Sequence, residues 1–121
     1  MLIVDDEPKI RAMLAESLKQ DGLVVTMAES GEEAMTKIAA AVPDLVMLDV
    51  KMKGMSGLDV LKRLRPLYPN LAVLLITGFD DEHVEEEAKQ YGALGVIHKP
   101  LMLAEVRHVT QTALANLPAS S

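Results

Sequence analysis

Three carboxylates stand at the ends of two apolar runs of this sequence. Asp5 and Asp6 follow residues 1–4 (MLIV), and Asp49 follows residues 45–48 (LVML). Unbroken apolar runs of this length are typical of strands that are buried on both faces of a sheet. Crowded carboxylates repel one another unless a cation offsets their charge, and such hard oxygen ligands suit Mg²⁺. The spacing therefore predicts a magnesium site, with Mn²⁺ as an alternative ion.

Two later apolar runs end in residues that bind phosphate. Lys99 offers a compact positive charge, Thr77 offers a hydroxyl, and Gly78 allows close approach of a backbone N–H. The sequence has no Gly-rich P-loop and no motif that reads a base or a ribose, which argues against a bound nucleotide. Aspartate can act as a covalent nucleophile toward phosphorus, and electrostatic stabilisation then supplies most of the catalysis. These residues predict a phosphoryl group that arrives on a carboxylate.

The elements that must position these residues alternate between strand and helix. We expect strands at residues 1–4, 23–27, 45–49, 71–76 and 95–98, each followed by a helix. This alternation predicts a parallel sheet covered by helices on both faces, with a ligand site at the carboxyl ends of the strands. The expected fold class is α/β, a single three-layer, doubly wound (βα)5 domain of flavodoxin-like type with strand order 2-1-3-4-5.

Start and stop signals mark the predicted helices. Pro8 suits a first turn, Gly22 and Gly92 suit helix ends, and Ser30 with Glu33 resembles a capping box. A further helix is expected to begin at Ser56–Asp59 and to end before Pro66. Another is expected to begin at Asp80–Glu82. The apolar positions expected to face inward are Ile10, Met13, Leu14, Leu18, Ala34, Ile38, Ala41, Leu58, Leu61, Leu64, Val84, Ala88, Tyr91, Leu103, Val106 and Ala113.

Composition narrows the function classes. The 121 residues fit one domain, and the 2% aromatic content provides no stacking platform for bases. A net charge of −6 argues against a nucleic-acid surface on this domain. There is no cysteine, and no apolar run reaches the length of a membrane span, so we expect a cytoplasmic protein with no membrane contact. We expect one domain over residues 1–117, with residues 118–121 as a tail or the start of a linker to a further part.

Four marks in order carry a resemblance to a known family. They are Val4-Asp5-Asp6-Glu7; Leu48-Asp49 with Met52 and Ser56-Gly57; Ile76-Thr77-Gly78; and His98-Lys99-Pro100. Each mark alone is common, but all four in this order over residues 1 to about 117 are specific. The chain resembles the receiver domain of bacterial two-component response regulators.

The resemblance implies a role for each site residue. Asp49 would accept a phosphoryl group from a phosphohistidine on a sensor kinase or a phosphotransfer protein. Asp6 and Asp49 would bind Mg²⁺ directly together with the backbone carbonyl of Lys51, and Asp5 would act through water. Lys99 and Thr77 would contact the phosphoryl oxygens, Gly78 would lie beside them, and the peptide bond before Pro100 would be cis.

The resemblance also implies a switch rather than a turnover enzyme. A phosphoryl group adds about −1.5 to −2 charges, and Thr77 can reach its oxygens only by moving inward with its loop and the fourth helix. That movement would control a partner or a linked effector outside this chain. Ile10 and Met13 either belong to the core or form the surface on which a kinase docks, and the protein would be a monomer or a weak, phosphorylation-dependent dimer.

Some positions depart from the family pattern. Val96 stands where the family often has an aromatic residue that packs inward as the threonine moves, and Lys53 stands where it usually has proline, which predicts a looser loop. Lys51 and Phe79 flank the entrance to the site and are expected to tune dephosphorylation.

Several alternatives stay open at this stage. The departures at Val96 and Lys53 fit a pseudo-receiver, a docking module that needs no phosphorylation. A phosphatase with an aspartyl intermediate is disfavoured, because Lys51 stands where such enzymes usually have a second acid. Residues 5–7 taken alone could be an acidic cluster at a helix start. His98 is expected to be an exposed edge residue turned away from Lys99, and residues 80–87 a solvated acidic helix face.

Overall fold

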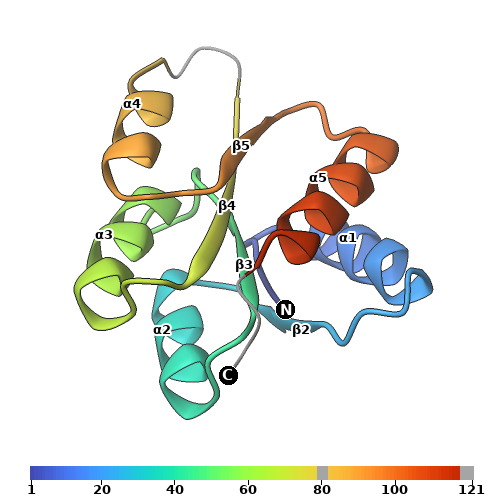
Figure 1. Cartoon of the computed structure of the whole chain (residues 1–121), viewed down its shortest axis with the longest axis horizontal. Helices are drawn as coiled ribbons and strands as arrows, with labels where there is room; N and C mark the ends of the chain where they lie inside the picture. The colour runs from blue at the N-terminus through green and yellow to red at the C-terminus, as the bar shows by residue number, and fades with distance from the viewer. Residues whose placement is uncertain (79–81, 118–121) are drawn as a thin grey trace.

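A five-stranded parallel sheet runs through the centre of the molecule, with helices on both sides (Figure 1). The computed structural model describes residues 1–78 and 82–117. The elements are β1 (Leu2–Val4), α1 (Pro8–Gln20), β2 (Thr26–Ala28), α2 (Gly31–Ala40), β3 (Leu45–Asp49), α3 (Gly57–Leu67), β4 (Ala72–Thr77), α4 (Glu82–Gln90), β5 (Gly95–His98) and α5 (Leu103–Ala115). The strand order β2-β1-β3-β4-β5 confirms the predicted doubly wound fold.

Two apolar cores lie on opposite faces of the sheet. Alternate side chains of β3 divide between them: Val46 and Leu48 belong to the core with residues of α2, α3 and α4, and Leu45 and Met47 belong to the core with residues of α1 and α5. Figure 1 shows these two groups of helices on opposite sides of the sheet. Every residue of β3 and β4 is buried, as the unbroken apolar runs predicted. Each fully buried Leu, Val or Ile contributes about 1.5–3 kcal/mol, which makes these central strands the rigid base of the sheet.

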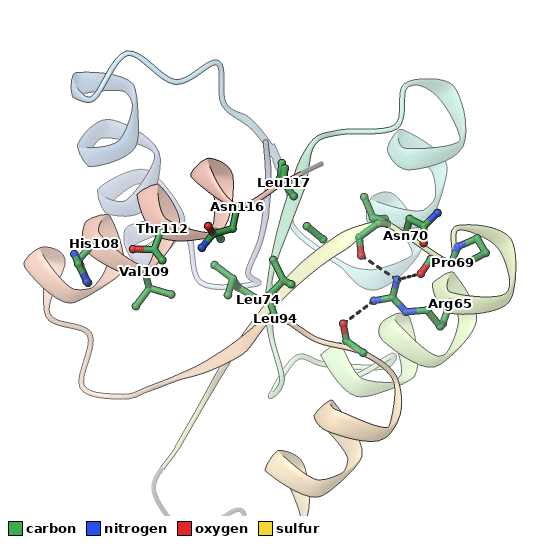
Figure 2. Close-up of a pocket in the computed structure, with 14 residues that line it drawn as sticks. Arg65, Pro69, Asn70, Leu74, Leu94, His108, Val109, Thr112, Asn116 and Leu117 are labelled. Atoms are coloured by element: carbon green, nitrogen blue, oxygen red, sulfur yellow. Dashed lines mark hydrogen bonds between the residues drawn. The ribbon is translucent and has the colours of Figure 1, made fainter. Parts of the chain in front are cut away.

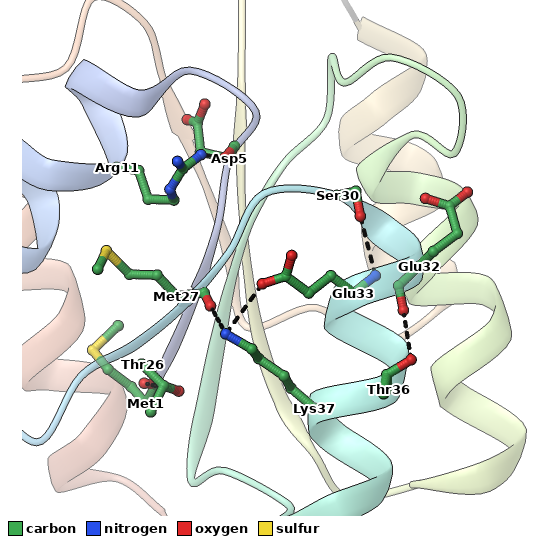
Figure 3. A network of polar contacts seen from close by, with 10 residues as sticks. All are labelled: Met1, Asp5, Arg11, Thr26, Met27, Ser30, Glu32, Glu33, Thr36 and Lys37. Carbon is green, nitrogen blue, oxygen red and sulfur yellow. Dashed lines mark hydrogen bonds and ion pairs between the residues drawn. The ribbon is translucent and has the colours of Figure 1, made fainter.

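The two serine-led helix starts differ in detail. Ser56 and Asp59 form a complete capping box at the start of α3, with bonds of 3.1 and 3.2 Å. The Ser30 hydroxyl accepts a bond from the Glu33 N–H at 3.1 Å, but the Glu33 carboxylate pairs with Lys37 one turn later (Figure 3). Of the two hydrogen bonds of the capping box predicted at Ser30, the structure therefore contains the one from the Glu33 N–H to the Ser30 hydroxyl.

Some predicted boundaries and core positions were wrong. The second strand begins at Thr26 instead of residue 23, and Val24 is 83% exposed, because this edge strand has only β1 as a neighbour. Pro66 lies inside the last turn of α3, where its missing N–H costs a single helical bond. Ala41 is exposed, because it follows the end of α2 in extended conformation.

Two apolar helix positions are also more exposed than predicted. Met13 on α1 and Leu103 at the start of α5 are each 37% exposed, whereas Leu14 and Val106 are fully buried. The predicted helix starts at Asp80 and Asp81 and the tail 118–121 lie outside the described residues. None of the described helices is both long enough and apolar enough to traverse a bilayer.

Candidate functional site

The chemistry-bearing residues meet at the carboxyl edge of the sheet. Parallel pairing sets Val4 beside Leu48, so the residues that follow, Asp5 and Asp49, leave the sheet at the same level. Thr77 at the end of β4 pairs with His98 at the end of β5, which places Lys99 one residue beyond. The sheet register thus brings residues that are distant in sequence to one edge, as predicted from strand ends.

Asp5, Asp6 and Asp49 form a tight acidic cluster. One carboxylate oxygen from each lies within 4.8 Å of the others. Asp5 and Asp49 are 0% and 1% exposed, and Asp6 is half-buried. The Glu7 N–H donates to Asp5 Oδ1 at 2.8 Å, and the Arg11 guanidinium donates to the Asp5 carbonyl at 2.7 Å (Figure 3). These bonds fix Asp5 between β1 and α1.

Burial dominates the electrostatics of the cluster. Burial and the neighbouring Asp5 charge raise the pKa of Asp49 from 3.8 to about 6, and the nearby Lys99 ammonium only partly opposes them. Burial also raises the pKa of Asp5, against the lowering effects of the Glu7 N–H and of Lys99. In the ion-free protein, the single Lys99 ammonium therefore does not offset the burial and mutual repulsion of these carboxylates.

Lys99 supplies the one ammonium group that contacts Asp49 among the described residues. Its Nζ lies 3.2 Å from Asp49 Oδ1, and the Lys99 side chain is partly buried. The Lys99 N–H donates to the Thr77 carbonyl at 2.7 Å, which couples the ends of β4 and β5. The Lys99–Pro100 peptide bond is cis, as expected.

The cluster fits a hard divalent cation. Asp5 Oδ2 and both carboxylate oxygens of Asp49 are buried, and apart from the Lys99 ammonium at Asp49 Oδ1 they lack a well-formed hydrogen bond from the described residues. Buried oxygens without donors are costly, and coordination to a cation would satisfy them. A cavity of about 540 Å³ next to the cluster, lined among others by Asp6, Lys51 and Lys53, gives room for water ligands.

The loop between β3 and α3 forms the side of this cavity. A Cβ on Gly57 would lie 2.4 Å from the Asp49 carbonyl oxygen, so glycine lets the loop pass close to the end of β3. The Lys53 N–H donates to Asp6 Oδ2 at 3.1 Å. Sequence reasoning missed this bond, because it involves the backbone of Lys53 and not its side chain.

The remaining predicted site residues lie around this cluster. Thr77 is buried, whereas Gly78 has open space at its Cβ position. His98 was predicted to be exposed, but it is half-buried, and its Nε2 lies 3.0 Å from the Glu85 carboxylate on α4. Val96 is half-buried and packs against the core on the α4 side.

Three further predictions concern the surroundings of the site. Ile10 on α1 is half-buried, and Lys51 is exposed at the cavity. Phe79 lies outside the described residues. The predicted solvated face holds for Glu85 and Glu86, which are exposed, whereas Glu87 is half-buried and pairs with Lys62 on α3 at 3.2 Å.

A second cavity lies at the opposite edge of the sheet. It has a volume of about 440 Å³ and is lined mainly by apolar side chains from the start of β4, the approach to β5 and the end of α5 (Figure 2). Its charged group, Arg65, donates to surrounding backbone carbonyls. Among the described lining residues there is no carboxylate, so the reactive groups belong to the carboxyl edge.

Comparisons with known proteins agree with this geometry. The sequence profile described as "Response regulator receiver domain" matches residues 1–111. The chain is 34% identical over 114 residues to sporulation initiation phosphotransferase F of Bacillus subtilis, covering 94% of this chain and 92% of that protein. It is 32% identical to the DNA-binding transcriptional regulator NtrC of Escherichia coli, covering 94% of this chain but 24% of that protein. The receiver domain of NtrX from Brucella abortus superposes with a TM-score of 0.89 at 31% identity, covering 95% of this chain and 98% of that one.

Proposed function

The chain belongs to the response regulator receiver domain family, and we propose that its Asp49 accepts a phosphoryl group from the phosphohistidine of a sensor kinase or a phosphotransfer protein. Residues 1–117 form the receiver unit in this proposal. The family is a signalling module rather than a turnover enzyme. The site residues would therefore assist their own phosphorylation and dephosphorylation, without a separate substrate.

The observation that carries the proposal is the position of the Asp49 carboxylate. It lies beside the carboxylates of Asp5 and Asp6 and the Lys99 ammonium, which is 3.2 Å from Oδ1, and both of its oxygens are buried. An oxygen of ionised Asp49 would attack phosphorus as the P–N bond to the donor imidazole breaks. The leaving imidazole takes a proton from solvent, and Asp49 becomes an acyl phosphate.

The acidic cluster would hold Mg²⁺, or Mn²⁺ in its place. Asp6 and Asp49 would be direct ligands with the Lys51 carbonyl, and Asp5 would act through a water ligand. When bound, the ion neutralises charge on the transferring phosphoryl group. This assignment is supported by the oxygen-only donor set and by the unsatisfied buried oxygens.

Lys99, Thr77 and the Gly78 backbone N–H would bind the phosphoryl oxygens. Thr77 ends a fully buried strand, and the chain continues from it toward α4. A bond from its hydroxyl to the new phosphoryl group would favour an inward position of this segment and shift α4. The output would then reach a partner through α4 and β5, without an aromatic residue at Val96.

The partners are proposed from chemistry and from the relatives. Two residues of α1 would contact the phosphodonor: Ile10, which is half-buried, and Met13, which is partly exposed. The chain spans about a quarter of NtrC, so a linked effector outside this chain is part of the proposal. The receiver unit would act as a monomer or a weak, phosphorylation-dependent dimer.

Intact-protein mass measurement tests the proposal. With acetyl phosphate and Mg²⁺, the protein should gain the mass of one phosphoryl group, and it should not do so in chelator. Asp49→Ala should abolish the gain, whereas Asp44→Ala, a control at an aspartate before β3, should keep it. A gain of mass in the Asp49→Ala protein would contradict the proposal.

The pseudo-receiver is the competing candidate, and the departures from the family pattern at Val96 and Lys53 favour it. In that case Asp49 could still be phosphorylated, but hydrogen exchange and partner binding would not change. Steady release of phosphate from a phosphomonoester would instead support a phosphatase.

A further inference from the structure

We propose that Lys53 is a positioning residue for the cation site, and that it acts through its backbone N–H on Asp6. This inference rests on the proposed function, because it concerns the ligand geometry of that same site. The N–H lies 3.1 Å from Asp6 Oδ2 and joins positions 47 residues apart in sequence. The Lys53 side chain itself is exposed.

The bond acts on a carboxylate with unfavourable neighbours. Asp6 shares the cluster with Asp5 and Asp49, so its carboxylate lies among like-charged neighbours. A hydrogen bond to Oδ2 fixes the orientation of the group, which leaves Oδ1 available to a cation. Such outer bonds to ligating carboxylates typically change metal affinity by about 10- to 100-fold.

The bond also positions the loop that carries a second proposed ligand. Between β3 and α3 the loop is held near its ends, where the Gly57 N–H donates to the Val50 carbonyl at 3.0 Å and Ser56 caps α3. Lys53 lies between these points and connects the loop to the end of β1 through Asp6. The Lys51 carbonyl and the Asp6 carboxylate are thereby held at a fixed separation before a cation binds.

Two substitutions at one position separate the backbone donor from the side chain. Lys53→Ala removes the ammonium but keeps the N–H, whereas Lys53→Pro removes both. Both variants carry the same charge, so their difference isolates the hydrogen bond. Proline is compatible with the local turn, because Gly54 follows with a φ of +76°, the pattern of a type II turn.

The experiment is a calorimetric titration of Mg²⁺ into the wild type and both variants. We expect Lys53→Pro to bind at least about tenfold more weakly than Lys53→Ala, while unfolding in chelator shows that both are folded. Equal or tighter binding by Lys53→Pro would overturn the inference. If the wild type binds no Mg²⁺, the proposed function fails first, and the two failures are thus distinct.

A second measurement applies if the proline variant does not fold. In ion-free wild type, the Lys53 amide should exchange its hydrogen slowly, and Asp6→Ala should remove this protection. The same exchange rate in the wild type and in Asp6→Ala would overturn the inference.

Discussion

Asp49 combines nearly complete burial with neighbours of both charges. Burial and the neighbouring Asp5 charge raise its pKa to about 6, and the Lys99 ammonium at 3.2 Å does not cancel their effect. A carboxylate ionised at such a site destabilises the folded protein when no cation is bound. The proposed phosphoacceptor is therefore expected to cost stability, as is common for functional sites.

Replacing Asp49 by Asn should stabilise the ion-free protein at neutral pH. The folded-state pKa exceeds the unfolded value, so the wild type loses stability as pH rises from about 4 to about 6 and keeps the full loss above that. The difference between 3.8 and about 6 sets an upper limit of about 3 kcal/mol. Urea unfolding in chelator at pH 4 and pH 7 measures this, and equal pH profiles for both proteins would contradict it.

Gly57 is required by a close backbone contact. Gly57→Ala would place a Cβ 2.4 Å from the Asp49 carbonyl oxygen. Because this oxygen belongs to the backbone of the central strand β3, relieving the clash would require the strand or the loop to shift. We expect a loss of about 2 kcal/mol or more in the free energy of unfolding. Gly95→Ala is the control, because its Cβ would meet Leu74 at an ordinary 3.5 Å. Equal effects of the two substitutions on urea unfolding would show that the contact is relieved.

The sequence identified candidate site residues, but it did not predict the hydrogen bonds and ion pairs that these residues make. Asp49, Thr77 and Lys99 could be placed because each ends an apolar run, and parallel strands end at one edge. The Lys53 N–H bond to Asp6 could not be predicted, because every residue except proline has the same backbone donor. The contact between His98 and Glu85 depends on side-chain conformations across two elements, which alternation along one strand does not determine.

At the scale of elements, α3 and α4 are joined near their carboxyl ends. The Arg65 guanidinium donates to five carbonyls, those of Tyr68, Pro69, Leu71, Tyr91 and Gly92. Figure 2 shows the bond to Pro69. Lys62 adds an ion pair to Glu87 at 3.2 Å and lies 5.7 Å from the centre of the Tyr91 ring. Burial lowers the pKa of Arg65, and its carbonyl bonds replace lost hydration.

Arg65→Met should destabilise the protein by about 2–4 kcal/mol, because several partly buried carbonyls lose their donor. Arg65→Lys should recover less than half of this loss, since one ammonium cannot reach carbonyls on both connecting segments. Arg63→Met is the matched control on the exposed face of the same helix and should have little effect. Chemical unfolding of the three variants measures these differences, and full recovery by lysine would contradict the geometric argument.

The sequence predicted which helices and strands exist more accurately than it predicted where each one begins and ends. Strands β3, β4 and β5 were predicted within one residue. For the central strands β3 and β4 the reason is that helices cover both faces of the sheet, which demands apolar side chains on each face. The edge strand β2 was misplaced, because residues 23–25 are apolar without forming a ladder. The last turn of α3 was lost from the prediction, because Pro66 was treated as a stop and not as a terminal helical residue.

At the scale of the whole molecule, the sheet separates the edge that carries the proposed phosphorylation site from the edge where Arg65 joins neighbouring segments. The acidic cluster lies at the carboxyl ends of the strands, whereas Arg65 ties segments at the opposite end. Helix α4 meets both regions, because Glu85 contacts His98 and Glu87 contacts Lys62. A signal from Asp49 should therefore move α4 about its anchored carboxyl end.

Hydrogen exchange of the phosphorylated protein tests this pivot. With acetyl phosphate and Mg²⁺, peptides covering residues 83–86 should change their exchange, because the contact of Glu85 with His98 lies on the reactive side. Peptides covering residues 88–92 should change less, because the Arg65 guanidinium donates hydrogen bonds to the carbonyls of Tyr91 and Gly92. Thr77→Ala should still be phosphorylated but lose the change at residues 83–86. Uniform change along α4 would rule out a pivot, and no change at all would favour the pseudo-receiver, in which phosphorylation has no structural consequence.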